Sequence, residues 1–145
     1  MTPGICLSLA VAASGLVNQA SESVFVNTQR FTLAWVHSIE KVRWEEDYAV
    51  IRTSNPGEPL ALEALAARVK GSAAGMEPGP DAVLKNGWYV YKPAQQTHKV
   101  LRLSRSFYTP DYELCMEGRC ALMAAFLKSD GGVTTLRACE SPALK

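Results

Sequence analysis

The sequence predicts a mainly β protein, folded as one antiparallel β-sandwich or barrel-like domain over residues 1–145. Turn-forming residues divide the chain into short segments, and most of these segments alternate polar with apolar residues or are rich in β-branched and aromatic residues. That pattern is typical of antiparallel sandwiches and barrels. The chain length is also near that of a single domain, and a hydrophobic fraction of 48% is enough to build one core.

Clusters rich in Gly, Pro, Asn, Asp and Ser mark the expected turns, because these residues favour bends through their backbone or their short polar side chains. They lie at 53–59, 71–80, 92–98, 108–111, 117–118 and 129–132. The expected strands span 30–39, 44–52, 86–92, 99–107, 112–116, 119–127 and 133–139. Two segments, 59–70 and 121–128, are instead rich in Ala and Leu, which favour helix, so either can form one short helix.

The N-terminal segment 5–14 fits two interpretations. Its apolar residues alternate as in a half-buried strand, with one side made of Ile5, Leu7, Leu9 and Val11. The same run, with the small residues Ala10-Val11-Ala12, also resembles an export signal with its cleavage site. No Lys or Arg precedes Arg30, so the positive region of such a signal is missing and we favour the strand. The apolar stretch 5–17 is shorter than the roughly 20 residues that cross a bilayer, so no membrane span is expected in this chain.

Charge and motifs exclude several classes of function. The formal net charge is +1 and the charged residues are scattered, so the chain lacks the basic stripe that nucleic acid requires. Phosphate-binding and dinucleotide fingerprints are absent, as is the Gly-x-Ser-x-Gly turn that presents a serine nucleophile. We therefore expect neither a nucleic-acid partner nor a bound cofactor.

The spacing of two cysteines predicts a disulfide across a tight hairpin. A two-residue turn at Glu117-Gly118 would pair Met116 with Arg119. The next pair outward is Cys115 with Cys120, at a non-hydrogen-bonded position where Cα atoms lie about 4.5 Å apart, a distance that a disulfide tolerates. This bridge would close without backbone distortion.

The remaining cysteines, Cys6 and Cys139, are then left to each other by elimination, which would join the first and last strands. Four reduced thiols are the alternative, with Cys6 and Cys139 as small core residues. A zinc site is disfavoured because the pair Cys115 and Cys120 has no second knuckle to complete it. Disulfides would indicate an oxidising compartment outside the cytoplasm.

The segment 35–48 concentrates the chemistry of the chain, since it holds two of the three Trp, one of the two His and four of the fourteen acidic residues. If residues 40–43 form the turn of a hairpin, the antiparallel partners are fixed. They would be Ile39 with Trp44, His37 with Glu46, Trp35 with Tyr48 and Leu33 with Val50. One face would then carry His37 against Glu46, with Trp35, Trp44 and Tyr48 as aromatic walls.

The pair His37 and Glu46 has a functional and a structural interpretation. The carboxylate favours the charged imidazole and burial disfavours it, so the pair can position a ligand or move a proton. A buried pair can equally serve only to hold the strand register, with its aromatic neighbours as core. A metal held by His37 with Glu40 or Glu46 is disfavoured, because too few nitrogen or sulfur ligands accompany it.

A resemblance to a known family is carried by the segments 31–48, 67–80, 86–91, 111–120 and 135–139. Their most specific pieces are "HS" followed by "WEE" in the first segment and the turn Ala73-Ala74-Gly75-Met76 in the second. Together they resemble the small bacterial family of unknown function DUF1850. Its members are commonly encoded beside TRAP transporters of the TAXI class, which use a periplasmic solute-binding protein and a fused membrane permease. Many relatives carry an N-terminal anchor or export signal, so the resemblance implies a periplasmic or extracytoplasmic location.

Two hypotheses about function follow. The first is a non-catalytic extracytoplasmic accessory of a TAXI-type TRAP transporter, which binds the permease, the solute-binding protein or the solute itself. An exposed apolar patch at the turn around Gly75 and Met76 would support protein binding. The alternative is a small hydrolase or isomerase, with His37 as the base and Glu46 as the residue that orients it.

Overall fold

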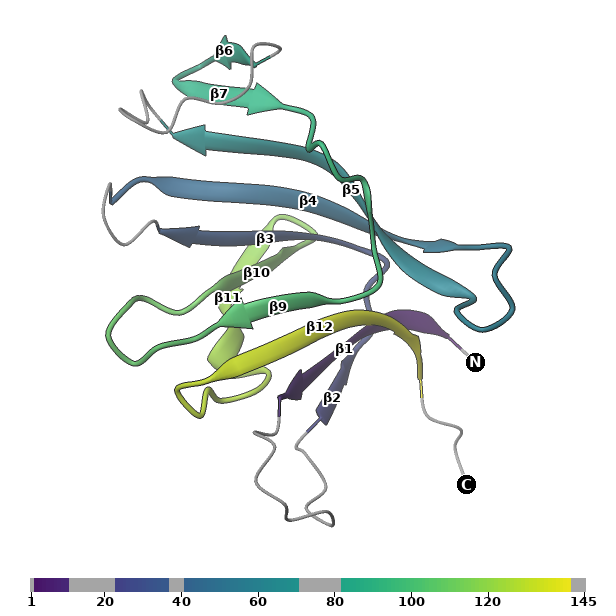
Figure 1. Ribbon diagram of the computed structural model, residues 1–145. Coiled ribbons are helices and arrows are strands. Elements are labelled where there is room, and N and C mark those ends of the chain that lie inside the picture. The colour runs from purple at the N-terminus through teal and green to yellow at the C-terminus, as the bar shows by residue number, and fades with distance from the viewer. Residues whose placement is uncertain (1, 11–22, 37–40, 71–81, 142–145) are drawn as a thin grey trace.

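The computed structural model describes residues 2–10, 23–36, 41–70 and 82–141. Two antiparallel sheets pack against each other around a shared core, so the prediction of a mainly β, sandwich-like fold is confirmed (Figure 1). The helical structure in this part of the chain is a single 3-10 turn, and no helix there has the length and apolar character needed to cross a membrane.

The smaller sheet has four strands in the order β2-β1-β12-β9. They are β1 (Pro3–Leu9), β2 (Ser23–Val26), β9 (Leu101–Ser104) and β12 (Val133–Glu140). In β1, Ile5 and Leu7 are fully buried while Cys6 and Ser8 are half-buried. The alternation that predicted an N-terminal strand is therefore confirmed for residues 3–9, and residues 11–14 lie outside the described part of the chain.

The larger sheet runs in the order β11-β10-β3-β4-β5-β7-β6, and β8 also pairs with β5. Its strands are β3 (Arg30–Val36), β4 (Arg43–Arg52), β5 (Leu60–Lys70), β6 (Val83–Lys85), β7 (Trp88–Tyr91), β8 (Thr97–His98), β10 (Glu113–Met116) and β11 (Arg119–Leu122). The two-residue turns Asn86-Gly87 and Glu117-Gly118 have positive φ at both positions. That geometry matches the right-handed twist of the strands they join.

The hydrophobic core lies between the sheets, because each sheet contributes the apolar side of its alternating strands. Its buried residues are Ile5, Leu7, Val26, Phe31, Leu33, Tyr48, Leu62, Ala64, Leu103, Leu114, Met123, Leu127 and Leu136. Met123 belongs to the 3-10 turn η1 (Met123–Ala125), which occupies part of the Ala- and Leu-rich segment 121–128. Of the two segments with helical composition, this second one holds the short helical turn.

The first of those segments, 59–70, forms the long strand β5 instead of a helix. Burial and pairing with β4 along its length override the helix propensity of its residues. The sequence conceals this strand because a bulge at Leu65, which has no partner on β4, shifts the register. On the face that carries Leu62, the buried residues are Leu62 and Ala64 before the bulge and Ala67 and Val69 after it. The bulge adds one residue between these two pairs, so the spacing of buried residues along the sequence departs from the period of two of a regular strand and resembles that of a helix.

Both predicted disulfides are present, and all four cysteines are bonded. Cys115 and Cys120 are direct partners in the hairpin of β10 and β11, with Cα atoms 3.9 Å apart. Cys6 and Cys139 join β1 to β12, with Cα atoms 5.9 Å apart. The alternatives of reduced thiols and of a cysteine-bound zinc ion are therefore excluded in this structure.

The antiparallel hairpin of β3 with β4 is confirmed, but its predicted register is wrong by four positions. Trp35 faces Trp44 rather than Tyr48, and Leu33 faces Glu46 rather than Val50. The observed register stacks Trp35 on Trp44, and it likewise stacks a second aromatic pair further along the strands. Such ring pairs stabilise a sheet beyond the area they bury.

Candidate functional site

Strand β4 directs alternate side chains to the two faces of the larger sheet. Trp44, Glu46 and Tyr48 lie on the inner face, since Tyr48 is part of the core between the sheets. Glu46 is half-buried and lies opposite Leu33 of β3 and Ala67 of β5, which are both buried. A carboxylate is thus set into an otherwise apolar row of the inner face.

Two tyrosines on the inner face border this carboxylate. The Tyr48 hydroxyl donates a hydrogen bond of 2.7 Å to Oε1 of Glu46. Tyr91 of β7 is the partner of Ala67, so it lies in the same cross-sheet row as Glu46 and on the same face. Only the small side chain of Ala67 separates Tyr91 and Glu46 along this row.

An aromatic belt crosses the sheet beside Glu46. Trp35 stacks on Trp44 with ring centroids 6.2 Å apart. Tyr112 contacts Trp35 at 5.9 Å, and Tyr91 meets Trp44 edge-on at 6.5 Å. Offset and edge-on contacts of this kind are favourable because they place the positive edge of one ring against the negative face of another. We call these four residues, Trp35, Trp44, Tyr91 and Tyr112, the aromatic belt.

A second group of rings lies on the other side of Glu46 along the strands. Phe31 stacks on Tyr48 with centroids 5.4 Å apart, and His98 of β8 meets Tyr48 edge-on at 6.0 Å. The His98 ring also contacts the backbone carbonyl of Gln95 through Nε2 at 3.2 Å. Tyr48 is therefore held in place on both its ring and its hydroxyl.

The tyrosines of the site keep their protons at neutral pH. Burial, together with the nearby Glu46 carboxylate, raises the pKa of Tyr48 far above its ordinary value. The same two causes, in the same order, raise the pKa of Tyr91 and of Tyr112. All three phenols therefore remain uncharged hydrogen-bond donors at neutral pH.

The loop between β9 and β10 borders the aromatic belt. Arg105 is buried, and its guanidinium makes two hydrogen bonds of 2.9 Å to Asp111 and one of 3.0 Å to Thr134. Asp111 in turn accepts the backbone N–H of Tyr112. This clamp fixes Tyr112 beside a cavity of about 310 Å³ that Trp35, Tyr112 and the loop line together.

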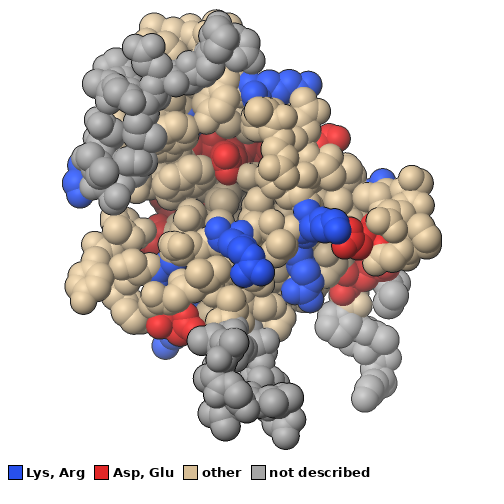
Figure 2. Space-filling model, viewed as in Figure 1, with Lys and Arg blue, Asp and Glu red and all other residues tan. Residues whose placement is uncertain are grey.

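Two polar groups of the inner face, on Glu46 and Trp44, lack an ion pair or a hydrogen-bond partner among the described residues. No Lys or Arg side chain among the described residues forms an ion pair with Glu46. The indole N–H of Trp44 is a buried donor that has no hydrogen-bond partner in the part of the chain that the structure describes. Figure 2, which views this side of the molecule, shows acidic atoms at the floor of a hollow over β4, bordered by uncharged residues. Buried polar groups normally have partners, so these two are candidates for contact with a ligand.

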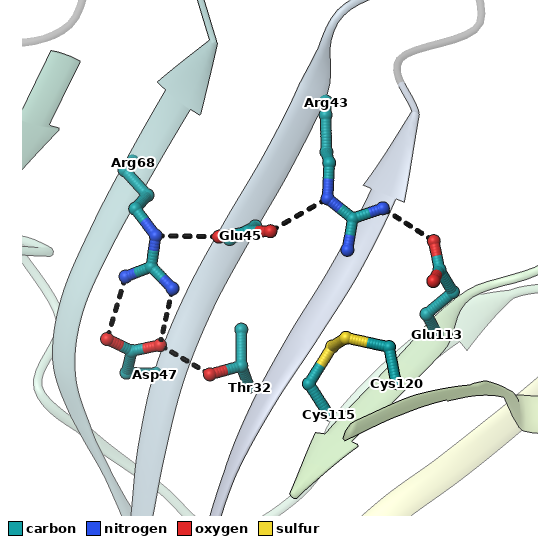
Figure 3. A network of polar contacts seen from close by, with 8 residues as sticks. All are labelled: Thr32, Arg43, Glu45, Asp47, Arg68, Glu113, Cys115 and Cys120. Atoms are coloured by element: carbon teal, nitrogen blue, oxygen red, sulfur yellow. Dashed lines mark hydrogen bonds and ion pairs between the residues drawn. A yellow bond between two sulfur atoms is a disulfide. The ribbon is translucent and has the colours of Figure 1, made fainter. Parts of the chain in front are cut away.

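The outer face of β4 carries a chain of ion pairs (Figure 3). Arg68 of β5 donates to Glu45 at 2.7 Å and to Asp47 at 2.8 and 3.1 Å. Arg43 donates to the other oxygen of Glu45 at 2.7 Å and also reaches Glu113 of β10. Each of these three acidic residues therefore has an arginine partner. We call these five residues the outer network.

Every charged group of the outer network has a partner of opposite charge. Hydrogen bonding to Asp47 raises the pKa of Arg68, and hydrogen bonding to Glu45 raises that of Arg43, so both guanidiniums stay charged. A cavity of about 460 Å³ lies beside the network and is bordered by the Cys115–Cys120 disulfide. Because each of its three acids is paired with one of its two arginines, we interpret this face as structural.

The predicted site residues are brought together only in part. Those that meet on the inner face are Trp35, Trp44, Glu46 and Tyr48. Three others, His37, Gly75 and Met76, lie outside the described residues. The predicted partner of Glu46 was His37, but Leu33 occupies that position. Within the described residues, no three His, Cys, Asp or Glu side chains gather as metal ligands.

Three residues of the site were not predicted from the sequence: Tyr91, Tyr112 and His98. They come from later parts of the chain, and strand order brings them to β4. The signal for Tyr91 was weak, since the run 88–91 is aromatic and β-branched on both faces. For Tyr112, the nearby turn residues gave no indication that the side chain would face Trp35.

Comparison with known proteins gives one match. A family model described as Domain of unknown function (DUF1850) matches residues 31–123, which is more than half of the chain. The matched range includes Glu46 and all four residues of the aromatic belt. No curated protein and no solved structure matches the chain.

Proposed function

Because the chain belongs to the family Domain of unknown function (DUF1850), we propose that it is a non-catalytic extracytoplasmic accessory of a TAXI-type TRAP solute transporter. The transporter association rests on the resemblance of the sequence to this family, whose members are commonly encoded beside such a transporter. In this role the protein binds the permease, the solute-binding protein or the transported solute.

A binding role is supported by the site on the inner face, which consists of Glu46, Tyr48 and the aromatic belt and which we call the inner-face site. Its rings are fixed by mutual stacking, and Tyr112 is held by the buried clamp of Arg105 with Asp111. Rigid aromatic side chains surrounding one charged group are typical of ligand-binding sites, because little conformational entropy is lost when a ligand enters.

Two disulfides support the extracytoplasmic location. Cys6–Cys139 and Cys115–Cys120 use all the cysteines of the chain. Such bonds form and persist in oxidising compartments such as the periplasm, and they are rare in the cytoplasm.

The test is co-purification with the transporter. The tagged chain is co-expressed with the permease and the solute-binding protein of a TAXI-type TRAP transporter, and the retained proteins and small molecules are identified by mass spectrometry. We expect one transporter component or its solute to be retained by the wild type and to be depleted with Glu46→Gln.

The matched control is Glu63→Gln. Glu63 lies on β5 between Leu62 and Ala64, which face the core, so its side chain points to the opposite side of the sheet from Glu46. It should retain the same partner as the wild type. If the wild type retains neither a transporter component nor a solute, the proposed function is wrong.

A further inference from the structure

The carboxylate of Glu46 is the charged centre of the inner-face site. The acids of the outer network all have arginine partners, whereas no Lys or Arg of the described residues pairs with Glu46. A half-buried carboxylate without a counter-charge is unfavourable, because it has lost part of its hydration and gained no ion pair. A bound cation would supply a counter-charge that no Lys or Arg of the described residues provides.

The aromatic belt favours the same sign of charge. The faces of Trp and Tyr rings are electronegative, and they attract cations within about 6 Å of the ring centroid, with Trp the strongest. Two tryptophans and two tyrosines lie in contact beside Glu46, with successive centroids 5.9 to 6.5 Å apart. An anion would meet both these ring faces and the carboxylate, so it would be repelled.

One carboxylate oxygen of Glu46 accepts no hydrogen bond from the described residues and can face a positive charge. Tyr48 occupies Oε1, and the described residues donate no hydrogen bond to Oε2. Burial and the nearby carboxylate raise the pKa of Tyr91 and of Tyr112, so neither phenol adds a competing negative charge at neutral pH. Oε2 of Glu46 is therefore positioned to interact with a charged nitrogen.

A cavity borders the aromatic belt at Trp35 and Tyr112. The cavity lined by Trp35 and Tyr112 measures about 310 Å³. That volume is at the small end of the range for small-molecule sites, roughly 300–1,000 Å³. Its lining includes Trp35 and Tyr112 but neither Glu46 nor Trp44, so it can hold only the part of a compact organic molecule that extends past the belt.

We propose that the inner-face site takes a small organic cation, with a substituted ammonium group seated against Glu46 and enclosed by the rings of Trp35 and Trp44. This assignment names the ligand class of the proposed binding function and rests on it. It fits a free small molecule, because the carboxylate is only half-buried and the rings of the aromatic belt lie beside it.

The test compares choline with its uncharged isostere 3,3-dimethyl-1-butanol. Both compounds are titrated into the full chain, with tryptophan fluorescence and calorimetry as readouts. Choline should bind saturably and perturb the fluorescence. The isostere has the same shape without the charge, so its affinity should be lower by about tenfold or more. This comparison uses only the wild type, so it does not depend on the folding of any variant.

Two variants locate the site. Glu46→Gln should weaken choline binding about tenfold, and Glu63→Gln should bind as the wild type does. Circular dichroism of both variants checks that the fold is retained. Equal binding of choline and the isostere would overturn the proposal, as would choline affinity that is unchanged in a folded Glu46→Gln variant.

The choline-binding test and the co-purification test can fail independently of each other. If the chain retains a transporter component but shows no preference for choline over the isostere, the cation site is wrong and the accessory role stands. If choline binds through Glu46 but no transporter component is retained, the cation site stands and the transporter assignment is wrong.

Discussion

The two faces of strand β4 handle acidic residues in opposite ways. On the outer face, Glu45 and Asp47 share the guanidinium of Arg68, and further pairs extend the outer network across the sheet. On the inner face, Glu46 accepts a hydrogen bond from Tyr48 and is bordered by aromatic rings. Neighbouring positions of one strand thus carry acids paired with arginines on one side and, on the other, an acid that no Lys or Arg of the described residues pairs with.

The difference indicates which acids belong to the fold and which one is available for binding. Pairs within the outer network gain Coulomb energy that offsets their desolvation, so they need no ligand. Glu46 is half-buried and has no such pair with a Lys or Arg of the described residues. The following predictions test this comparison, in order of decreasing effect.

The largest effect should follow from Tyr48→Ala on the inner face. Tyr48 is 3% exposed and packs on Phe31 within the core, so truncation leaves a cavity and should cost about 3–5 kcal/mol of unfolding free energy. Tyr48→Phe, which loses only the hydrogen bond to Glu46, should cost about 1 kcal/mol. Urea unfolding of both variants gives the two values. Similar losses would show that the ring contributes little to the core.

A smaller effect should follow from Arg68→Met on the outer face. The substitution leaves Asp47 without its arginine and Glu45 with only Arg43, and should cost about 1–2 kcal/mol at low ionic strength. Because the pairs are partly exposed, the difference from the wild type should shrink in high salt. Arg102→Met, at an exposed position of β9, is the control. A loss that does not depend on salt would contradict an electrostatic role.

Alkaline pH should weaken the inner face through its tyrosines. The folded-state pKa values of Tyr48, Tyr91 and Tyr112 are raised above the unfolded value of about 10, so the folded state holds these protons more tightly. Their contribution is complete below pH 10 and is lost as the pH rises above it. Thermal melts across this range should show the decrease.

The pH effect depends on Glu46, which is one cause of all three shifts. In Glu46→Gln, phenolate absorbance should therefore appear at lower pH than in the wild type. An unchanged tyrosine titration would mean that the carboxylate is not near these rings.

The smallest effect on stability should be that of Glu46→Gln itself. The amide oxygen still accepts the Tyr48 hydrogen bond, and a partly desolvated charge is removed, so the unfolding free energy should change by less than about 1 kcal/mol. Glu45→Gln should be the more destabilising of the two, because Arg43 and Arg68 both lose their charged acceptor. A reversed order would remove the distinction between the two faces.

Local alternation in the sequence predicted which face each residue of β4 occupies, but not its partner across the hairpin. The predicted and observed registers differ by four positions, as the pairing of Trp35 with Trp44 instead of Tyr48 shows. A shift by an even number leaves every side chain on the same face. The apolar pattern therefore fits both registers equally, and the stacking of rings on each other distinguishes them.

The site needed long-range information that the sequence does not display. Tyr91 reaches Glu46 only because β7 lies beside β5, and the bulge at Leu65 concealed β5 as a strand. The disulfide Cys115–Cys120 was predictable because a two-residue turn fixes its geometry within six residues of chain. Contacts set by a short turn were thus accessible, and contacts set by strand order were not.

The Cys6–Cys139 bridge makes the chain between these residues a covalent ring, since the cysteines are 133 positions apart. A pulling force applied before Cys6 and after Cys139 is carried by the bridge rather than by the strands. The sheets inside the ring then bear no mechanical load. A single proteolytic cut within the ring leaves the two pieces attached until the bridge is reduced. A force that pulls on the two ends of the chain therefore does not unfold the domain while the bridge is intact.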